Sequence, residues 1–146
     1  MALVDRLDHI VLTVRDIEAT CAFYSNVLGM RPVVFDGDHW ALHFGSQKIN
    51  LHRTGHEFEP KAERATPGAA DLCFITLTQM DVVVAHLQAH QVRVIEGPGP
   101  QVGAIGQLTS VYFHDPDGNL IEISNYDQPN MVTESCNARS RESGAQ

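Results

Sequence analysis

Basic residues are scarce in this 146-residue chain, where ten Lys and Arg stand against eighteen Asp and Glu and give a formal net charge of −8. A nucleic-acid-binding surface needs clustered Lys and Arg to neutralise phosphates, so the composition argues against such a partner. It argues equally against attraction to an anionic membrane surface. A protein with a small-molecule ligand fits this charge best.

Long apolar runs and metal-type cysteine spacing are also missing. No apolar stretch approaches the roughly 20 residues needed to span a bilayer, and no signal peptide opens the sequence, since Met1 to Arg6 leads directly into a strand-like segment. Three cysteines, Cys21, Cys73 and Cys136, are an odd number without metal-type spacing, which predicts reduced thiols. We therefore expect one cytoplasmic domain, long enough to bury a core.

The first half of the chain predicts a strand, a helix and three further strands. Residues 7–14 alternate as a strand does, and Asp16 then caps a helix that ends at Gly29. Three strands are expected over 32–35, 40–44 and 48–52, the last two forming a hairpin.

The second half repeats this order. Residues 71–77 alternate again, and Thr78 with Asp81 predicts a capping box for a helix through about Gln91. Cys73 shares a face with Ile75 in this strand and is expected in the core. Strands are expected over 92–95, 110–114 and 120–124, and the Gly/Pro-rich stretch 97–106 is expected to be a mobile loop over one end of the groove described next.

Two tandem βαβββ modules of an α+β fold follow from this repeat. We expect a single domain over residues 5–126, with halves 5–53 and 70–126 and a connection over 54–69, followed by a polar and disordered tail over 127–146. Each half would form a curved four-stranded sheet with its helix outside. Side by side, the two sheets would make an open half-barrel groove.

Glu122 is the leading candidate for chemistry, because it follows the turn Asp115-Pro116-Asp117-Gly118-Asn119 on a strand whose other face is apolar. An acid in that place faces a groove, a partner or solvent, and an acid on an outer sheet face is the plain alternative. The repeat aligns Asp8-His9 with Asp71-Leu72 and Asn50 with Glu122. Its expected groove residues are His9, Asn50, His52, Leu72, Glu122 and, less strongly indicated, Tyr112.

Several motifs in order resemble the vicinal oxygen chelate superfamily of glyoxalase I, bleomycin resistance proteins and extradiol dioxygenases. They are LDHIVLTV, FYSNVLGM, FGSQKINLH, HEFEPKA, ADLCFIT and DPDGNLIEISNY, and they span residues 7–126. Within the superfamily they look most like a branch of glyoxalase-domain and bacterial virulence-associated proteins. The resemblance implies a groove-bound divalent metal that polarises two neighbouring substrate oxygens.

By this resemblance His9 and Glu122 are metal ligands, whereas Asn50 and Leu72 stand where the other two ligands are expected. Leu72 cannot bind a metal and Asn50 is a weak ligand for zinc or nickel. His52 lies two residues beyond Asn50 on the same strand face. A set of His9, His52 and Glu122 would suit zinc, nickel, manganese or iron and leave positions open for substrate.

The expected function is a metal-dependent lyase or isomerase of glyoxalase type, similar to lactoylglutathione lyase, with Glu122 as ligand, base or both. The substrate would be a small molecule with adjacent oxygens. Two alternatives stay open: a non-catalytic protein that sequesters an antibiotic-like ligand, and an extradiol-type dioxygenase. The resemblance also implies a homodimer.

Overall fold

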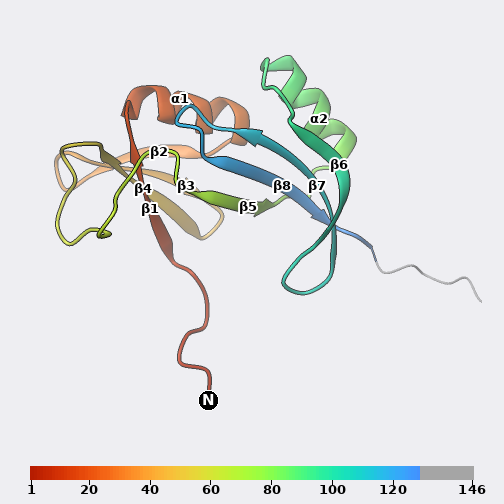
Figure 1. The fold of residues 1–146 in the computed structure, drawn as a ribbon, viewed down its shortest axis with the longest axis horizontal. Helices are drawn as coiled ribbons and strands as arrows, with labels where there is room; N and C mark the ends of the chain where they lie inside the picture. The colour runs from red at the N-terminus through yellow and green to blue at the C-terminus, as the bar shows by residue number, and fades with distance from the viewer. Residues whose placement is uncertain (129–146) are drawn as a thin grey trace, which may run out of the picture.

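The computed structural model describes residues 1–128 as ten helices and strands (Figure 1). The expected tail lies outside the described residues from position 129 onward. No helix within residues 1–128 has the length and apolar character to cross a membrane. The elements are β1 (His9–Val14), α1 (Ile17–Leu28), β2 (Arg31–Phe35), β3 (His39–Phe44), β4 (Gln47–Arg53), β5 (Asp71–Ile75), α2 (Met80–Ala89), β6 (Glu96–Val102), β7 (Gln107–His114) and β8 (Leu120–Tyr126).

The tandem α+β architecture is confirmed. Two four-stranded sheets have the equivalent orders β1-β4-β3-β2 and β5-β8-β7-β6. In each, the first strand pairs parallel with the last, while the other neighbours are antiparallel. Both helices lie on the same side of the sheets, above them in Figure 1, so the opposite faces remain open.

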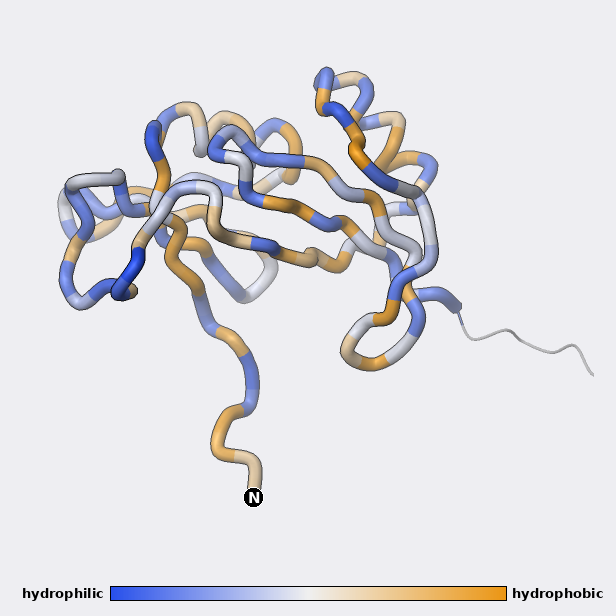
Figure 2. Tube along the Cα trace, in the orientation of Figure 1, coloured by the Kyte–Doolittle hydropathy of each residue, from blue (hydrophilic) through white to orange (hydrophobic). Residues whose placement is uncertain are grey.

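The first helix begins and ends where the sequence indicates. The Asp16 carboxylate accepts a hydrogen bond from the backbone N–H of Ala19 at 2.9 Å, and Gly29 ends the helix with φ of 69°. This left-handed conformation favours glycine because a side chain would clash there. Polar and apolar residues alternate in β4, whose sequence is QKINLHR, and the hydropathy tube shows hydrophilic and hydrophobic segments within the strands (Figure 2). One core cluster joins both halves.

Two local predictions for the second half are wrong. The capping box of Thr78 and Asp81 does not form: Gln79 is the N-cap of α2 without a side-chain bond, and Asp81 instead accepts from the N–H of Val82. Residues 92–95 are not a strand, although Val92 and Val94 do pack against the core.

Most of the Gly/Pro-rich stretch predicted as a mobile loop belongs to the edge strand β6, and only residues 103–106 lie outside the strands, between β6 and β7. β6 pairs antiparallel with β7, with a register irregularity between Glu96 and Gly99. Pro98 and Pro100 have no N–H to donate, which an edge strand tolerates because one side of it has no partner strand. Proline content alone therefore gave a misleading indication of a loop.

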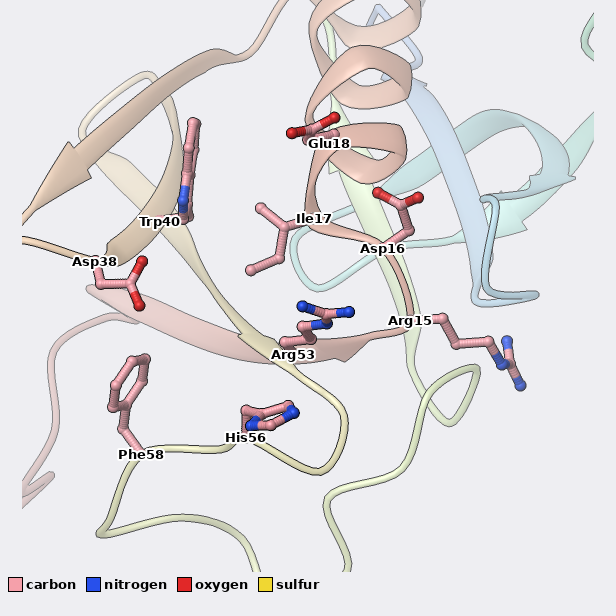
Figure 3. Close-up of a pocket in the computed structure, with 9 residues that line it drawn as sticks. All are labelled: Arg15, Asp16, Ile17, Glu18, Asp38, Trp40, Arg53, His56 and Phe58. Atoms are coloured by element: carbon pink, nitrogen blue, oxygen red, sulfur yellow. The ribbon is translucent and has the colours of Figure 1, made fainter.

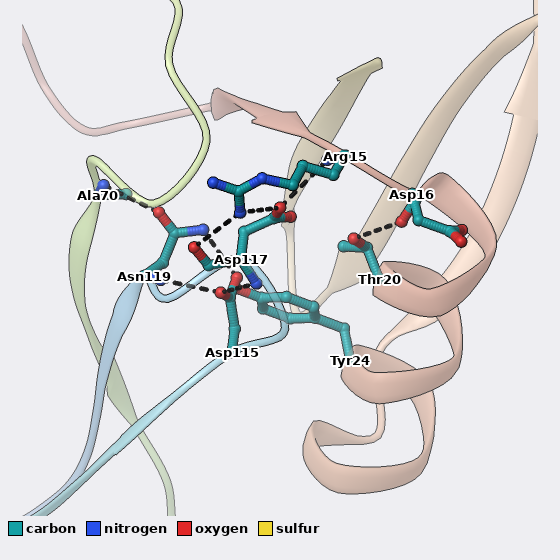
Figure 4. A network of polar contacts seen from close by, with 8 residues as sticks. All are labelled: Arg15, Asp16, Thr20, Tyr24, Ala70, Asp115, Asp117 and Asn119. Atoms are coloured by element: carbon teal, nitrogen blue, oxygen red, sulfur yellow. Dashed lines mark hydrogen bonds and ion pairs between the residues drawn. The ribbon is translucent and has the colours of Figure 1, made fainter. Parts of the chain in front are cut away.

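The Asp115 carboxylate joins the two halves (Figure 4). It is 5% exposed, and it accepts four hydrogen bonds of 2.8 to 2.9 Å, from the backbone N–H groups of Asp117 and Asn119, the Asn119 amide and the Tyr24 hydroxyl. Tyr24 belongs to α1 in the first half. Burial and the nearby Asp115 charge raise the pKa of Tyr24, which keeps the phenol a donor.

Two further contacts from the same turn bind the halves and the connection. The Asp117 carboxylate forms an ion pair with Arg15 at 3.1 Å, and Asn119 accepts from the N–H of Ala70 at 2.9 Å. At Gly68 a Cβ atom would lie 2.6 Å from the Asp117 carbonyl oxygen, so the connection approaches the turn more closely than any side chain allows.

Replacing Tyr24 by Phe should lower the free energy of unfolding by about 1 to 3 kcal/mol, because it leaves one oxygen of a buried carboxylate with fewer donors. Urea unfolding measures the loss. Tyr126→Phe is the matched control, since the Tyr126 hydroxyl makes none of the hydrogen bonds found within residues 1–128, and it should change stability by less than about 0.5 kcal/mol. Equal losses in the two variants would contradict the role of Tyr24.

Candidate functional site

Strand alternation places most of the expected groove residues on the faces opposite the helices. In β4, Ile49 and Leu51 are buried in the core, which turns Asn50 and His52 to the open face. In β8, Ile121 and Ile123 are buried in the same way, which turns Glu122 to the open face of the second sheet.

Leu72 is the exception, because it packs against the core. The ladders pair Val11 with Asn50 and Cys73 with Glu122. Cys73 is therefore the equivalent of Val11, and the equivalent of His9 is Asp71. The sequence alignment matched two Asp residues and slipped by one position, and a slip of one residue in a strand exchanges its two faces.

Cys73 consequently lies on the groove face, and its predicted place in the core is wrong. The residue is exposed, and its Sγ atom lies 3.3 Å from the Ser124 hydroxyl. Cys73 and His9 both line a crevice of about 110 Å³ where β1 and β4 meet β5. The structure thus brings His9 near Cys73, which is the strand neighbour of Glu122.

Glu122 is held by hydroxyl groups on its own face. The Ser124 hydroxyl, 0% exposed, donates to Glu122 Oε1 at 3.2 Å and lies 2.7 Å from the Ser110 hydroxyl. An ionised carboxylate only accepts and a hydroxyl has one proton. The Ser124 hydroxyl therefore donates its hydrogen bond to Glu122 and accepts hydrogen bonds from Ser110 and Cys73. The donor and acceptor of each of these three hydrogen bonds are thereby determined.

Tyr112 faces Glu122 across the β7 and β8 ladder. Burial, together with hydrogen bonding to the Glu122 carboxylate, raises the pKa of Tyr112 to about 12. The phenol is therefore protonated at neutral pH and serves as a donor. We name Cys73, Ser110, Tyr112, Glu122 and Ser124 the Glu122 cluster.

His52 lies in the first sheet with an unmet hydrogen-bonding requirement. It is 8% exposed, its Nδ1 atom is buried without a partner, and its ring packs edge-on against Phe58 with centroids 5.4 Å apart. Asn50 Oδ1 is unpartnered as well. Burial, followed by the charge of nearby His39, lowers the pKa of His52, so the imidazole is neutral at pH 7.

The expected metal ligands do not form a site within one chain. In the parallel ladder His9 pairs with Lys48, and His52 with Thr13. The Cα atoms of His9 and His52 are therefore four residues, or about 13 Å, apart along the strand direction. His9 Nδ1 contacts Asp8 at 2.7 Å. No three His, Cys, Asp or Glu side chains in the described part of the chain are grouped so as to hold a metal ion.

A second hollow, of about 550 Å³, lies at the N-terminal end of α1 (Figure 3). Trp40 and Phe58 form aromatic walls, with Asp38 on one side and Arg53 and His56 on another. Phe58 also stacks on His39 with ring centroids 3.9 Å apart, which links this hollow to the surroundings of His52. Its lining comes from separate segments, so no local sequence motif indicated it.

The comparison with protein families identifies the class. A family model described as the Glyoxalase/Bleomycin resistance protein/Dioxygenase superfamily matches residues 6–123. The chain belongs to this superfamily, which confirms the resemblance seen in its motifs.

Three relatives narrow the position within it. The chain is 54% identical to Virulence protein STM3117 of Salmonella typhimurium over 124 residues, 85% of this chain and 86% of that protein. The crystal structure of that protein matches with a TM-score of 0.85 and 53% identity, covering 86% of this chain and 100% of that one. Glyoxalase domain-containing protein RDO1 of Mycosarcoma maydis is 50% identical over 82% of this chain and 68% of its own. Biphenyl-2,3-diol 1,2-dioxygenase 3 of Rhodococcus globerulus is 32% identical over 92% of this chain and 70% of its own.

We predict that His52 titrates below its ordinary value of 6.5 in an NMR pH titration. A depressed pKa in the folded state means that the unfolded chain binds the proton more readily. Stability is therefore full above about pH 6.5 and falls as the pH drops below it. His52→Gln should make the free energy of unfolding less dependent on pH in this range. An unchanged slope in the variant would contradict the burial of a neutral imidazole.

Proposed function

We propose that this protein is a lyase or isomerase of glyoxalase type, acting on a small substrate with adjacent oxygens and using Glu122 as general base. The observation that supports this most is the orientation of the Glu122 carboxylate by the fully buried Ser124 hydroxyl. A carboxylate held in one direction on an open sheet face suits proton abstraction, which depends on geometry before pKa.

The residues of the Glu122 cluster supply an acid–base mechanism. Glu122 takes a proton from the carbon next to a substrate carbonyl, and the electrons of the broken C–H bond move to the carbonyl oxygen. Once Glu122 carries that proton, the neutral Tyr112 phenol turns its single hydrogen from Glu122 to the developing oxyanion. Glu122 then returns the proton to the former carbonyl carbon, while the hydroxyl proton on the first carbon passes to the oxyanion. A carbonyl is left at the first carbon, which completes an isomerisation without net gain or loss of atoms.

Glu122→Gln should reduce proton exchange at this carbon by about 100-fold or more, since an amide cannot serve as the base. Proton NMR in D₂O measures the loss of α-proton signal from hydroxyacetone and from the hemithioacetal of methylglyoxal. Glu63→Gln, a change in the exposed connection, is the charge-matched control and should exchange at the wild-type rate. Equal rates for both variants would rule out Glu122 as the base.

A divalent metal is implied by the resemblance, but residues 1–128 do not group three ligands for it. No step above therefore passes through a metal. Zinc, nickel, manganese or iron on His9 and Glu122 remains a prediction. Elemental analysis tests it, because an ion that is lost on His9→Ala would place the metal there.

Chelation should leave the folded protein intact. Since no group of three ligands holds the described residues together, EDTA treatment should shift Tm by less than about 1 °C, unlike the removal of a structural zinc ion. A thermal melt with and without EDTA measures this. A fall of several degrees that added zinc reverses would contradict this prediction and indicate a bound ion that stabilises the fold.

Ligand sequestration is the second candidate, favoured by the separation of the expected ligands. Two results together would support it. Metal-free protein would bind a ligand in a thermal-shift screen, and Glu122→Gln would leave both ligand binding and chemistry unchanged. The dioxygenase relative keeps oxygenase chemistry as a further alternative, which oxygen uptake with catechols after anaerobic iron loading would reveal.

A homodimer in the cytoplasm is also proposed. Exposed Val11 and Ile75, on the open faces of two edge strands, are suited to a partner copy.

A further inference from the structure

A cavity of about 560 Å³ lies between β1 and the connection that follows β4. We call it the connection cavity. Val11 and Thr13 of β1, His52 of β4, and Lys61 and Arg64 of the connection contribute to its lining. Its volume is within the range of pockets that hold small organic molecules, about 300 to 1,000 Å³.

The charge of the connection cavity is opposite to that of the protein. The chain carries a formal net charge of −8, yet no Asp or Glu residue is among the described residues that line this cavity, whereas Lys61 and Arg64 are. Lys61 has one loose ion pair, 3.5 Å from Glu59, and Arg64 forms none within residues 1–128. Two cations are thus available to an anionic group.

His52 adds an independent reason to expect a ligand. It is more than nine-tenths buried, and its Nδ1 atom has no hydrogen-bond partner among the residues that the structure describes. A buried polar group left unpaired destabilises the fold, so such groups in native proteins normally have a water or ligand partner. Its side chain belongs to the lining of the connection cavity, as do those of Lys61 and Arg64.

Much of the remaining wall is apolar, and Thr13, Thr66 and Asn119 are its polar members. Val11 and Pro60 lie beside a run of small side chains from the connection, including Ala62 and Ala65. An inorganic anion would leave this apolar surface uncovered. An organic anion would cover it while its charged end reaches the two cations.

We propose that the connection cavity binds an organic carboxylate with an apolar body, whose carboxylate group lies toward Lys61 and Arg64 and whose polar atoms reach His52. Val11 and Thr13 of β1 and His52 of β4 lie on the open face of the first sheet, so the cavity borders that face. The identification of this carboxylate as the substrate rests on the proposed function. Binding itself does not.

Isothermal titration of EDTA-treated protein with benzoate, phenylacetate and hexanoate tests the proposal. At least one carboxylate should bind, and its uncharged amide, such as benzamide for benzoate, should bind at least about tenfold more weakly. Replacing both cations, Lys61→Gln with Arg64→Gln, should weaken carboxylate binding about five- to thirtyfold, as expected for two partly solvated charges. Both residues are exposed, so the variant should fold as the wild type does.

Arg93→Gln removes an exposed cation outside the cavity and is the matched control. It should bind as the wild type does. The proposal is overturned if no carboxylate binds, if the amide binds as tightly as the acid, or if the double variant matches Arg93→Gln. If inorganic phosphate bound as tightly as the carboxylates, the claim that the ligand has an apolar organic body would be overturned.

Glu122→Gln separates this proposal from the proposed function. Carboxylate binding should persist in that variant while proton exchange is lost. Loss of carboxylate binding in the double cation variant, together with intact binding in Glu122→Gln, would assign the connection cavity to recognition of the anion independently of the chemistry of Glu122.

Discussion

The buried carboxylate of Asp115 is the constraint on which the arrangement of the two halves depends. A charge placed among apolar side chains is tolerated only when donors surround it. Here the donors come from its own turn and from Tyr24 of the first helix. The first half cannot move away from the second without taking the Tyr24 donor from that buried charge.

The same turn also positions the chemistry, because β8 begins directly after it. Fixing Asp115 and Asn119 fixes the start of β8, and the alternation of that strand then turns Glu122 toward Ser124 and Tyr112. The polar turn is therefore structural, whereas the residues that follow it carry the proposed function. The first sheet contributes a different environment, in which buried His52 lies beside a cavity with two cations.

Much of the fold could be predicted from the sequence because its signals are local. The cap at Asp16, the glycine at position 29 and the alternation around Glu122 each depend on neighbouring residues, and all three match the structure. The repeat itself was visible as well. Its register was not, because the hydrophobic patterns of two short strands fit almost equally well after a slip of one residue.

The features that the sequence did not predict depend on contacts between distant segments. Pro98 and Pro100 suit an edge strand once β7 is beside them, and the groove position of Cys73 follows from its pairing with Glu122. The connection cavity forms only when residues 60–70 fold against β1. The separation of His9 from His52 likewise follows from strand register, which the order of motifs does not contain.

Native-state hydrogen exchange of Asp115→Asn protein, followed residue by residue by NMR, is the most direct test of the coupling between the halves. The neutral side chain cannot satisfy all the donors that surround the carboxylate. The slowest amides of β4 and β8 should therefore lose protection together and by the same free energy. A loss confined to the turn and β8, with β4 as protected as in the wild type, would contradict the role of Asp115 in joining the two halves.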